Sequence, residues 1–105
     1  MIIKLKRLTD DAMVPTKATD GAAGFDLYLA EDERINCGST VLCKTGIAIE
    51  LPRGYEGQVR SRSGLAKDGV VVANSPGTID SDYRGEVGVL LHNQGSYDKI
   101  LRKGE

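Results

Sequence analysis

The sequence has few of the residues that build aromatic cores, metal sites or nucleophilic triads. Its 105 residues include no tryptophan, one phenylalanine, one histidine and two cysteines. Because there is neither a C-x-x-C pair nor a cluster of histidines, a structural zinc site is not expected. The sequence has no elbow motif with a serine or cysteine for which the single histidine, His92, could act as general base, so a nucleophilic triad is excluded. His92 is instead predicted to be a surface residue at the end of a strand.

A strong charge bias and long apolar runs are also absent. The net charge is -1, and the lysines and arginines are scattered along the chain, which argues against a polymeric nucleic-acid partner. The N-terminal MIIKLKRL lacks the continuous apolar stretch of a signal peptide or a transmembrane helix. Cys37 and Cys43 are predicted to be reduced and structural. We therefore expect a soluble, cytoplasmic protein that does not bind membranes.

What the sequence does contain is a pattern typical of an all-β domain. Thirteen glycines accompany a mainly aliphatic set of apolar residues. Apolar and polar residues alternate with a period of two near residues 3–6, 25–29, 47–51 and 87–91, and turn signals such as LPRG and SPG separate these runs. VVVA predicts a strand buried on both faces, and SGLAKDG predicts one short helical turn. Residues 1–105 are therefore predicted to form a single domain.

Two segments in the first 70 residues have compositions that suit ligand binding. In AAGFDLYLAEDERI, residues 22–35, small residues permit close backbone approach, and Asp26 is the candidate functional side chain; an outward-facing strand aspartate is the alternative. In RSRSGLAKDG, residues 60–69, the arginines, serines and glycine can donate to phosphate oxygens. Solvated arginines on a turn are the alternative there. The absence of G-x-x-x-x-G-K-[ST] excludes a P-loop.

A third segment, NSPGTIDSDYRGEV at residues 74–87, combines turn residues with an acid and an aromatic ring. NSPG and the two glycines predict a hairpin. Within it, Asp80 can take a proton from water, and the ring of Tyr83 offers a flat apolar wall with a polar tip. A charged surface turn is the alternative that this segment leaves open.

Taken in order, AAGFDLYLAED, RSRSGLA and NSPGTIDSDYRGEV resemble the first three signature motifs of the trimeric dUTP pyrophosphatases (dUTPases). The resemblance covers essentially the whole chain. It implies a distorted β-barrel or jelly-roll subunit, and a homotrimer whose active sites lie between subunits. It also implies Mg²⁺-dependent hydrolysis of dUTP to dUMP and pyrophosphate.

For the nucleoside, the resemblance implies roles within the third segment. Asp80 would orient and deprotonate the water that attacks the α-phosphorus, and the ring of Tyr83 would lie against the deoxyribose and reject a 2′-hydroxyl. Arg84 and Glu86 are expected to brace the hairpin or to pair between subunits. A wrong base would leave buried donors and acceptors unpaired. The implied substrate-binding residues here are Asn74, Gly77, Thr78, Ile79, Asp80 and Tyr83.

For the triphosphate, the resemblance implies residues of a neighbouring subunit. Arg62, Ser63 and Gly64 match the phosphate-binding segment, and Ser63 would donate to the region that gains charge as pyrophosphate leaves. Asp26 matches the acid that holds Mg²⁺ through water molecules. The expected cofactor is therefore Mg²⁺, and the expected partners are dUTP and further copies of the chain.

The final residues depart from the family pattern. LRKGE resembles the start of the fourth motif, and the fifth motif, a glycine-rich arm that closes over the nucleotide, does not follow. A chain truncated before these motifs, with slow turnover, is therefore expected. Two alternatives stay open: an enzyme like the related dCTP deaminases, and a non-catalytic module that binds deoxyuridine nucleotides.

Overall fold

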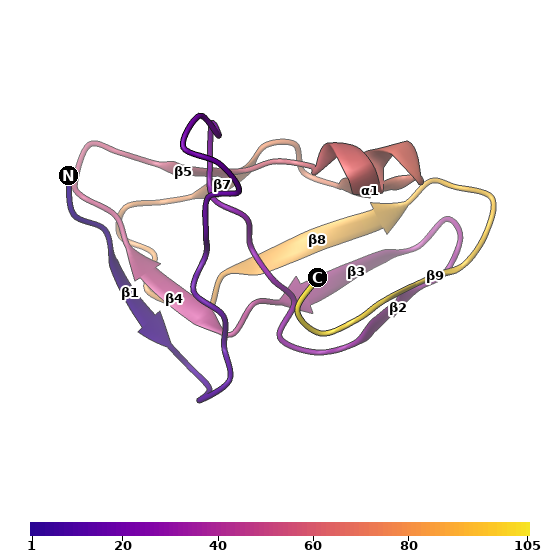
Figure 1. Ribbon diagram of the computed structural model, residues 1–105, viewed down its shortest axis with the longest axis horizontal. Helices are drawn as coiled ribbons and strands as arrows, with labels where there is room; N and C mark the ends of the chain where they lie inside the picture. Colours follow the sequence, from indigo (N-terminus) through magenta and orange to yellow (C-terminus); the bar gives the residue numbers. More distant parts are fainter.

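The computed structural model describes residues 1–105 and contains nine short strands and one short helix (Figure 1). No helix is both long enough and apolar enough to cross a membrane. The predicted helical turn is α1, and the alternating runs near residues 3–6, 47–51 and 87–91 correspond to β1, β4 and β8. In chain order the elements are β1 (Lys4–Arg7), β2 (Glu33–Ile35), β3 (Thr40–Lys44), β4 (Ile47–Glu50), β5 (Gly57–Val59), α1 (Ser63–Lys67), β6 (Val70–Val72), β7 (Gly77–Ile79), β8 (Gly88–Asn93) and β9 (Lys99–Leu101).

The strands pair antiparallel in four small sheets that do not close into a barrel. The sheets are β1–β4, β2–β9, β3–β8–β6 and β5–β7. In Figure 1 the three-stranded sheet runs through the middle of the molecule, with β1–β4 towards one end and α1 at the other. The predicted all-β, jelly-roll-like fold is confirmed. The expected barrel is not closed, because each hydrogen-bonded ladder is short and the chain then passes to a different sheet.

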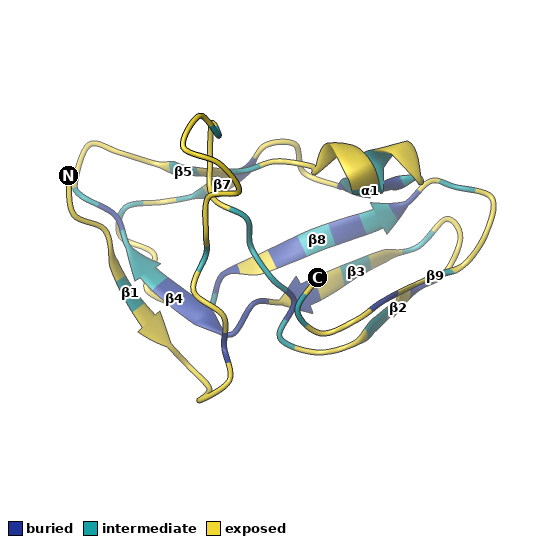
Figure 2. Cartoon of the chain, in the orientation of Figure 1, coloured by how far each residue is buried: buried dark blue, intermediate teal, exposed yellow.

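The core lies between the inner faces of these sheets and is aliphatic (Figure 2). Alternate residues of β8, namely Val89, Leu91 and Asn93, are buried, as the period of two predicts. Cys43 lies opposite Val89 in the register and is fully buried, and this burial raises the pKa of its thiol to about 11. Cys37 is exposed, and neither cysteine forms a disulfide, as predicted.

The apolar pattern at residues 25–29 does not form the predicted strand. Only an isolated bridge joins Asp26 to Thr16. The backbone N–H of Leu29 donates instead to the carbonyl of Glu105, at 2.8 Å. Successive backbone groups thus find their partners in separate segments, so no continuous ladder forms, although the local pattern is that of a strand.

Two predictions of burial were also wrong. Val70 and Val72 of β6 are buried but Val71 is only half-buried, so β6 is covered fully on one face rather than two. His92 is the penultimate residue of β8, near the strand end as predicted, but it is half-buried rather than a surface residue. Its Nδ1 is 2.9 Å from the hydroxyl of Thr40 on the neighbouring β3. Val71 and His92 are both half-buried because the outer face of the three-stranded sheet is only partly covered.

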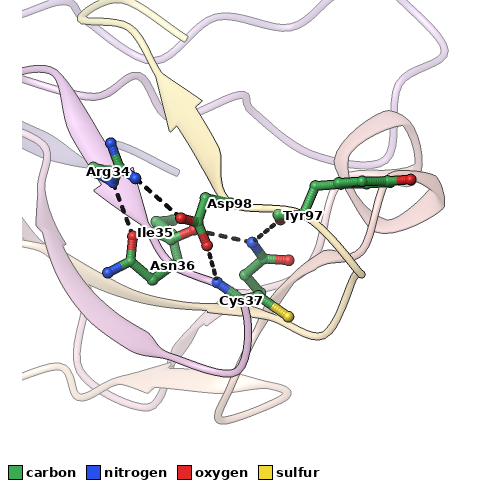
Figure 3. Close-up of polar contacts among 7 residues, drawn as sticks. Arg34, Ile35, Asn36, Cys37, Tyr97 and Asp98 are labelled. Carbon is green, nitrogen blue, oxygen red and sulfur yellow. Dashed lines mark hydrogen bonds and ion pairs between the residues drawn. The ribbon is translucent and has the colours of Figure 1, made fainter.

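A polar network around Asn93 joins the end of β2 to the loop before β9 (Figure 3). The side-chain amide of Asn93 donates to the carbonyls of Ile35, at 2.9 Å, and Tyr97, at 2.8 Å. Its Oδ1 accepts from the backbone N–H of Gly95 at 2.9 Å. No buried side-chain nitrogen or oxygen lacks a partner. Asn93 therefore satisfies loop groups that would otherwise be buried without a hydrogen bond.

Asp98 extends this network to the turn after β2. Its carboxylate accepts from the backbone N–H of Cys37 at 2.8 Å and from Arg34 Nη2 at 3.0 Å (Figure 3). The Cys37 N–H, and then Arg34, hold the pKa of the Asp98 carboxyl below its usual range. Because the folded pKa is lower than the unfolded one, this contribution to stability is present above the unfolded pKa and is lost as the pH falls through the folded pKa.

Replacing Asn93 by leucine is expected to destabilise the fold, because two carbonyls and one N–H would lose their partner. The free energy of unfolding measured with urea should fall by about 2 kcal/mol or more. Asn36→Leu is the matched control, since Asn36 is exposed and the only hydrogen bond of its side chain is the one from Arg34. Equal effects of the two substitutions would contradict the role given to Asn93.

Replacing Asp98 by asparagine is expected to lower stability at neutral pH. The difference from the wild type should shrink as the pH falls from the ordinary aspartate pKa of about 3.9 through the lower pKa of the folded state, because the Asp98 carboxyl is then protonated in both states. Urea unfolding at a series of pH values measures this. Asp20→Asn is the control, because Asp20 is exposed. A difference that stays constant with pH would show that the charge of Asp98 does not matter.

Candidate active site

The 74–87 segment begins with β7, which pairs with β5. The register places Gly57 opposite Ile79 and Val59 opposite Gly77. Gly77 is buried, and a Cβ on it would lie 3.4 Å from the amide nitrogen of Asn74, so the glycine lets Asn74 fold against β7. The predicted hairpin is wrong in one respect: β8 pairs with β3 and β6, so the two arms do not pair with each other. Of the other predicted residues, Ile79 is half-buried, and Asn74, Thr78, Asp80 and Tyr83 are exposed.

Residues 80–83 form the turn that carries both the candidate acid and the aromatic ring. The backbone N–H of Tyr83 donates to the carbonyl of Asp80 at 3.1 Å. Arg84 donates through Nη1 to the carbonyl of Ser81 at 2.6 Å, and its Nη2 lies 3.2 Å from the carboxylate of Glu50 on β4. Arg84 therefore braces the turn, as expected. Sequence reasoning missed Glu50, which has no signal beyond its place at the end of an alternating run.

The side chain of Tyr83 turns towards the residues that follow it in the sequence. Its hydroxyl donates to the carbonyl of Glu86 at 2.7 Å. The Glu86 carboxylate accepts from the backbone N–H of buried Gly46 at 2.9 Å, so the expected brace is made within one subunit. The N–H of Val87 donates to the carbonyl of Ile47 at 2.8 Å. These contacts anchor the end of the 74–87 segment to the start of β4.

The candidate phosphate-binding segment follows β5 and leads into α1. The hydroxyl of Ser61 accepts from the backbone N–H of Val72 at 2.9 Å, which attaches the segment to β6. Arg62 has an extended backbone at the N-cap position of α1, where its side chain makes no cap. Arg62, Ser63 and Gly64 are all exposed. Their donors are therefore free to meet a ligand.

Asp26 lies beside this segment. Its carboxylate is 3.9 Å from Arg62 Nε and is partly shielded from solvent. Both side chains, with Ser63 and Gly64, line an open cavity of about 1170 Å³ whose other walls are mostly apolar side chains. No group of three or more His, Cys, Asp or Glu residues gathers anywhere in the chain. A cation at Asp26 would therefore need most of its ligands from elsewhere.

Asp80 and the candidate phosphate-binding residues do not line one hollow within a single copy of the chain, although Ile79 lines the cavity of Arg62. Asp80 opens onto a different hollow, of about 820 Å³, together with Tyr55, Asp82 and Arg84. The register of β5 and β7 explains this, because Asp80 lies beyond the Gly57 end of the pair and Arg62 beyond the Val59 end. The separation agrees with the expectation that residues 62–64 serve the site of a neighbouring subunit, which a single chain does not test.

The chain has an all-β fold, and its candidate general base and candidate phosphate-binding segment line different hollows. These features agree with one family. The family model described as dUTPase matches residues 10–105, and the chain belongs to the dUTPase family. The resemblance seen in the three motifs is confirmed.

Curated relatives carry the same name. A deoxyuridine 5'-triphosphate nucleotidohydrolase of Hydrogenobaculum sp. is 54% identical over 100% of this chain and 74% of its own length. One of Clostridioides difficile is 55% identical over 96% of this chain and 71% of its own length. The chain therefore spans about three quarters of the length of the first relative and slightly less of the second.

Solved structures support the fold. A dUTPase from phage phi11 of S. aureus superimposes with a TM-score of 0.91, covering 100% of this chain and 85% of the phage chain at 21% identity. The dUTPase of Staphylococcus bacteriophage 80alpha gives a TM-score of 0.90 at 23% identity. At such low identity these structures bear on the fold alone.

Proposed function

We propose that this chain hydrolyses dUTP to dUMP and pyrophosphate. The proposal rests on sequence identity: more than half of the aligned residues are the same in relatives named deoxyuridine 5'-triphosphate nucleotidohydrolase, over almost the whole chain. None of the relatives described here is a deaminase, so no observation favours the dCTP deaminase alternative. The cytoplasmic location and the single domain at residues 1–105 stay predictions.

Asp80 is proposed as the general base. It takes a proton from the water that attacks the α-phosphorus, so that the P–O bond to the leaving pyrophosphate breaks as the new P–O bond forms. The support is geometric: its carboxylate is exposed and faces a polar hollow, and the Tyr83 N–H and Arg84 fix the turn on which it lies. A carboxylate on a braced turn needs little reorganisation before reaction.

The uracil and deoxyribose are proposed to bind along the same segment. Asn74 and Thr78 present exposed polar groups near buried Gly77, and these groups are the candidates for hydrogen bonds to the base edge. Ile79 supplies a half-buried apolar contact. The ring of Tyr83 is the proposed wall against the deoxyribose, held in place through its hydroxyl.

Arg62, Ser63 and Gly64 are proposed to bind the triphosphate of a nucleotide held mainly by a neighbouring copy. In one copy Asp80 and Arg62 lie beyond opposite ends of the β5–β7 pair and line different hollows, which favours a site that takes the two groups from different copies. A cyclic homotrimer supplies the second group from the next subunit, because each head-to-tail contact brings two different faces together.

Mg²⁺ is proposed to bind near Asp26. The residues fit an ion that keeps its waters and is ligated mainly by phosphate oxygens, since one carboxylate is present and no three-residue cluster surrounds it. When bound, the ion would neutralise charge on the triphosphate. Asp26 would then accept hydrogen bonds from water molecules of the ion, and Arg62 would help to hold this carboxylate in position.

Asp80→Asn is expected to lower the rate of pyrophosphate release from dUTP by at least about 100-fold, because the general base is lost. Binding of dUMP, measured by calorimetry, should change little. Asp82→Asn is the matched control, since Asp82 is exposed on the same turn. Nucleotide binding by the wild type without any pyrophosphate release would contradict the proposed hydrolysis and favour the non-catalytic module.

Mixing two inactive variants tests whether the site is shared. Asp80→Asn and Arg62→Ala should each be nearly inactive, but subunits mixed after unfolding and refolding should regain activity. In a random mixture about one quarter of the shared sites combine an intact acid with an intact arginine. No regain of activity, with trimers verified by light scattering, would show that each site belongs to a single chain.

A further inference from the structure

The ring of Tyr83 packs directly against the backbone of Gly85. A Cβ added to Gly85 would lie 2.6 Å from the Tyr83 hydroxyl oxygen and 2.8 Å from Cζ, which is far closer than real Cβ contacts. The backbone of Gly85 does not have the positive φ that disfavours other residues. A side chain at position 85 would therefore require the ring of Tyr83 to move, and the constraint is space rather than backbone conformation.

The contact fixes where the aromatic wall lies. With no side chain at position 85, the ring folds back until its hydroxyl reaches the carbonyl of Glu86, at 2.7 Å. Glu86 is in turn bonded to the backbone N–H of buried Gly46, at 2.9 Å. The ring is thus positioned through two hydrogen bonds against the start of β4, although Tyr83 itself remains 45% exposed.

We infer that Gly85 is a specificity-determining positioning residue, which selects deoxyribonucleotides over ribonucleotides by letting Tyr83 take this position. The inference rests on the proposed function, in which the ring of Tyr83 lies against the deoxyribose. A ring displaced by even a methyl group at position 85 leaves space where the 2′-hydroxyl of a ribonucleotide is otherwise rejected. Gly85 itself does not touch the nucleotide.

A purely structural role of Gly85 predicts a different result. If a substitution only destabilised the fold, binding of deoxyribo- and ribonucleotides would weaken by the same factor, because both need the folded chain. The ratio of the two dissociation constants is therefore insensitive to stability. It changes only if the wall against the sugar moves.

The experiment measures dissociation constants for dUMP and UMP by calorimetry in the wild type and in Gly85→Ala. We expect the preference for dUMP over UMP to fall by at least about tenfold in Gly85→Ala, which corresponds to a wall that no longer rejects the hydroxyl. Gly21→Ala is the matched control, because a Cβ there meets nothing within 4 Å, and its preference should equal that of the wild type. An unchanged preference in Gly85→Ala overturns the inference.

A double-mutant cycle tests the contact if Gly85→Ala folds poorly. In a Tyr83→Ala background the ring is absent, so adding Gly85→Ala should cause little further loss of the Tm. An equal loss in both backgrounds overturns the inference, because the ring would not be the obstacle. If the wild type itself binds dUMP and UMP equally well, the proposed role of Tyr83 is overturned together with the inference on Gly85. If the wild type prefers dUMP and Gly85→Ala keeps that preference, only the inference on Gly85 is overturned.

Discussion

The attachment of the 74–87 segment to the start of β4 is the constraint on which the candidate site depends. The backbone N–H of Val87 donates a hydrogen bond to the carbonyl of Ile47, and the carboxylate of Glu86 accepts one from the N–H of Gly46. Gly46 and Ile47 are both buried, so this end of the segment cannot move without disturbing the core. The turn at residues 80–83 is exposed, and it keeps one geometry only because its two ends are held.

The same pairing of strands that orders this turn also divides the site. β5 and β7 place the candidate acid beyond one end of the pair and the phosphate-binding segment beyond the other. The two groups line different hollows. Under the proposed function these groups are two half-sites on one subunit, and a complete site forms where unlike faces of two copies meet. Catalysis and assembly would then be coupled through geometry alone.

Some elements follow from local pattern and others do not. β8 was predictable because its inward residues alternate, and α1 because SGLAKDG lacks that alternation. Residues 25–29 alternate in the same way, yet they form only one bridge, because their backbone partners lie in distant segments such as Glu105. Spacing within a segment carries no information about which distant chain will be there to pair with it.

From the sequence alone, the all-β class and the family were predicted, and candidates for the acid, the ring and the phosphate-binding residues were named, because each depends on residue types at short spacing. The tertiary structure decided which of these groups meet. It placed Asp26 beside Arg62, separated both from Asp80, and packed Tyr83 on Gly85. These relations depend on strand register and on side-chain packing between residues of different segments, and neither is encoded in the spacing of any one motif.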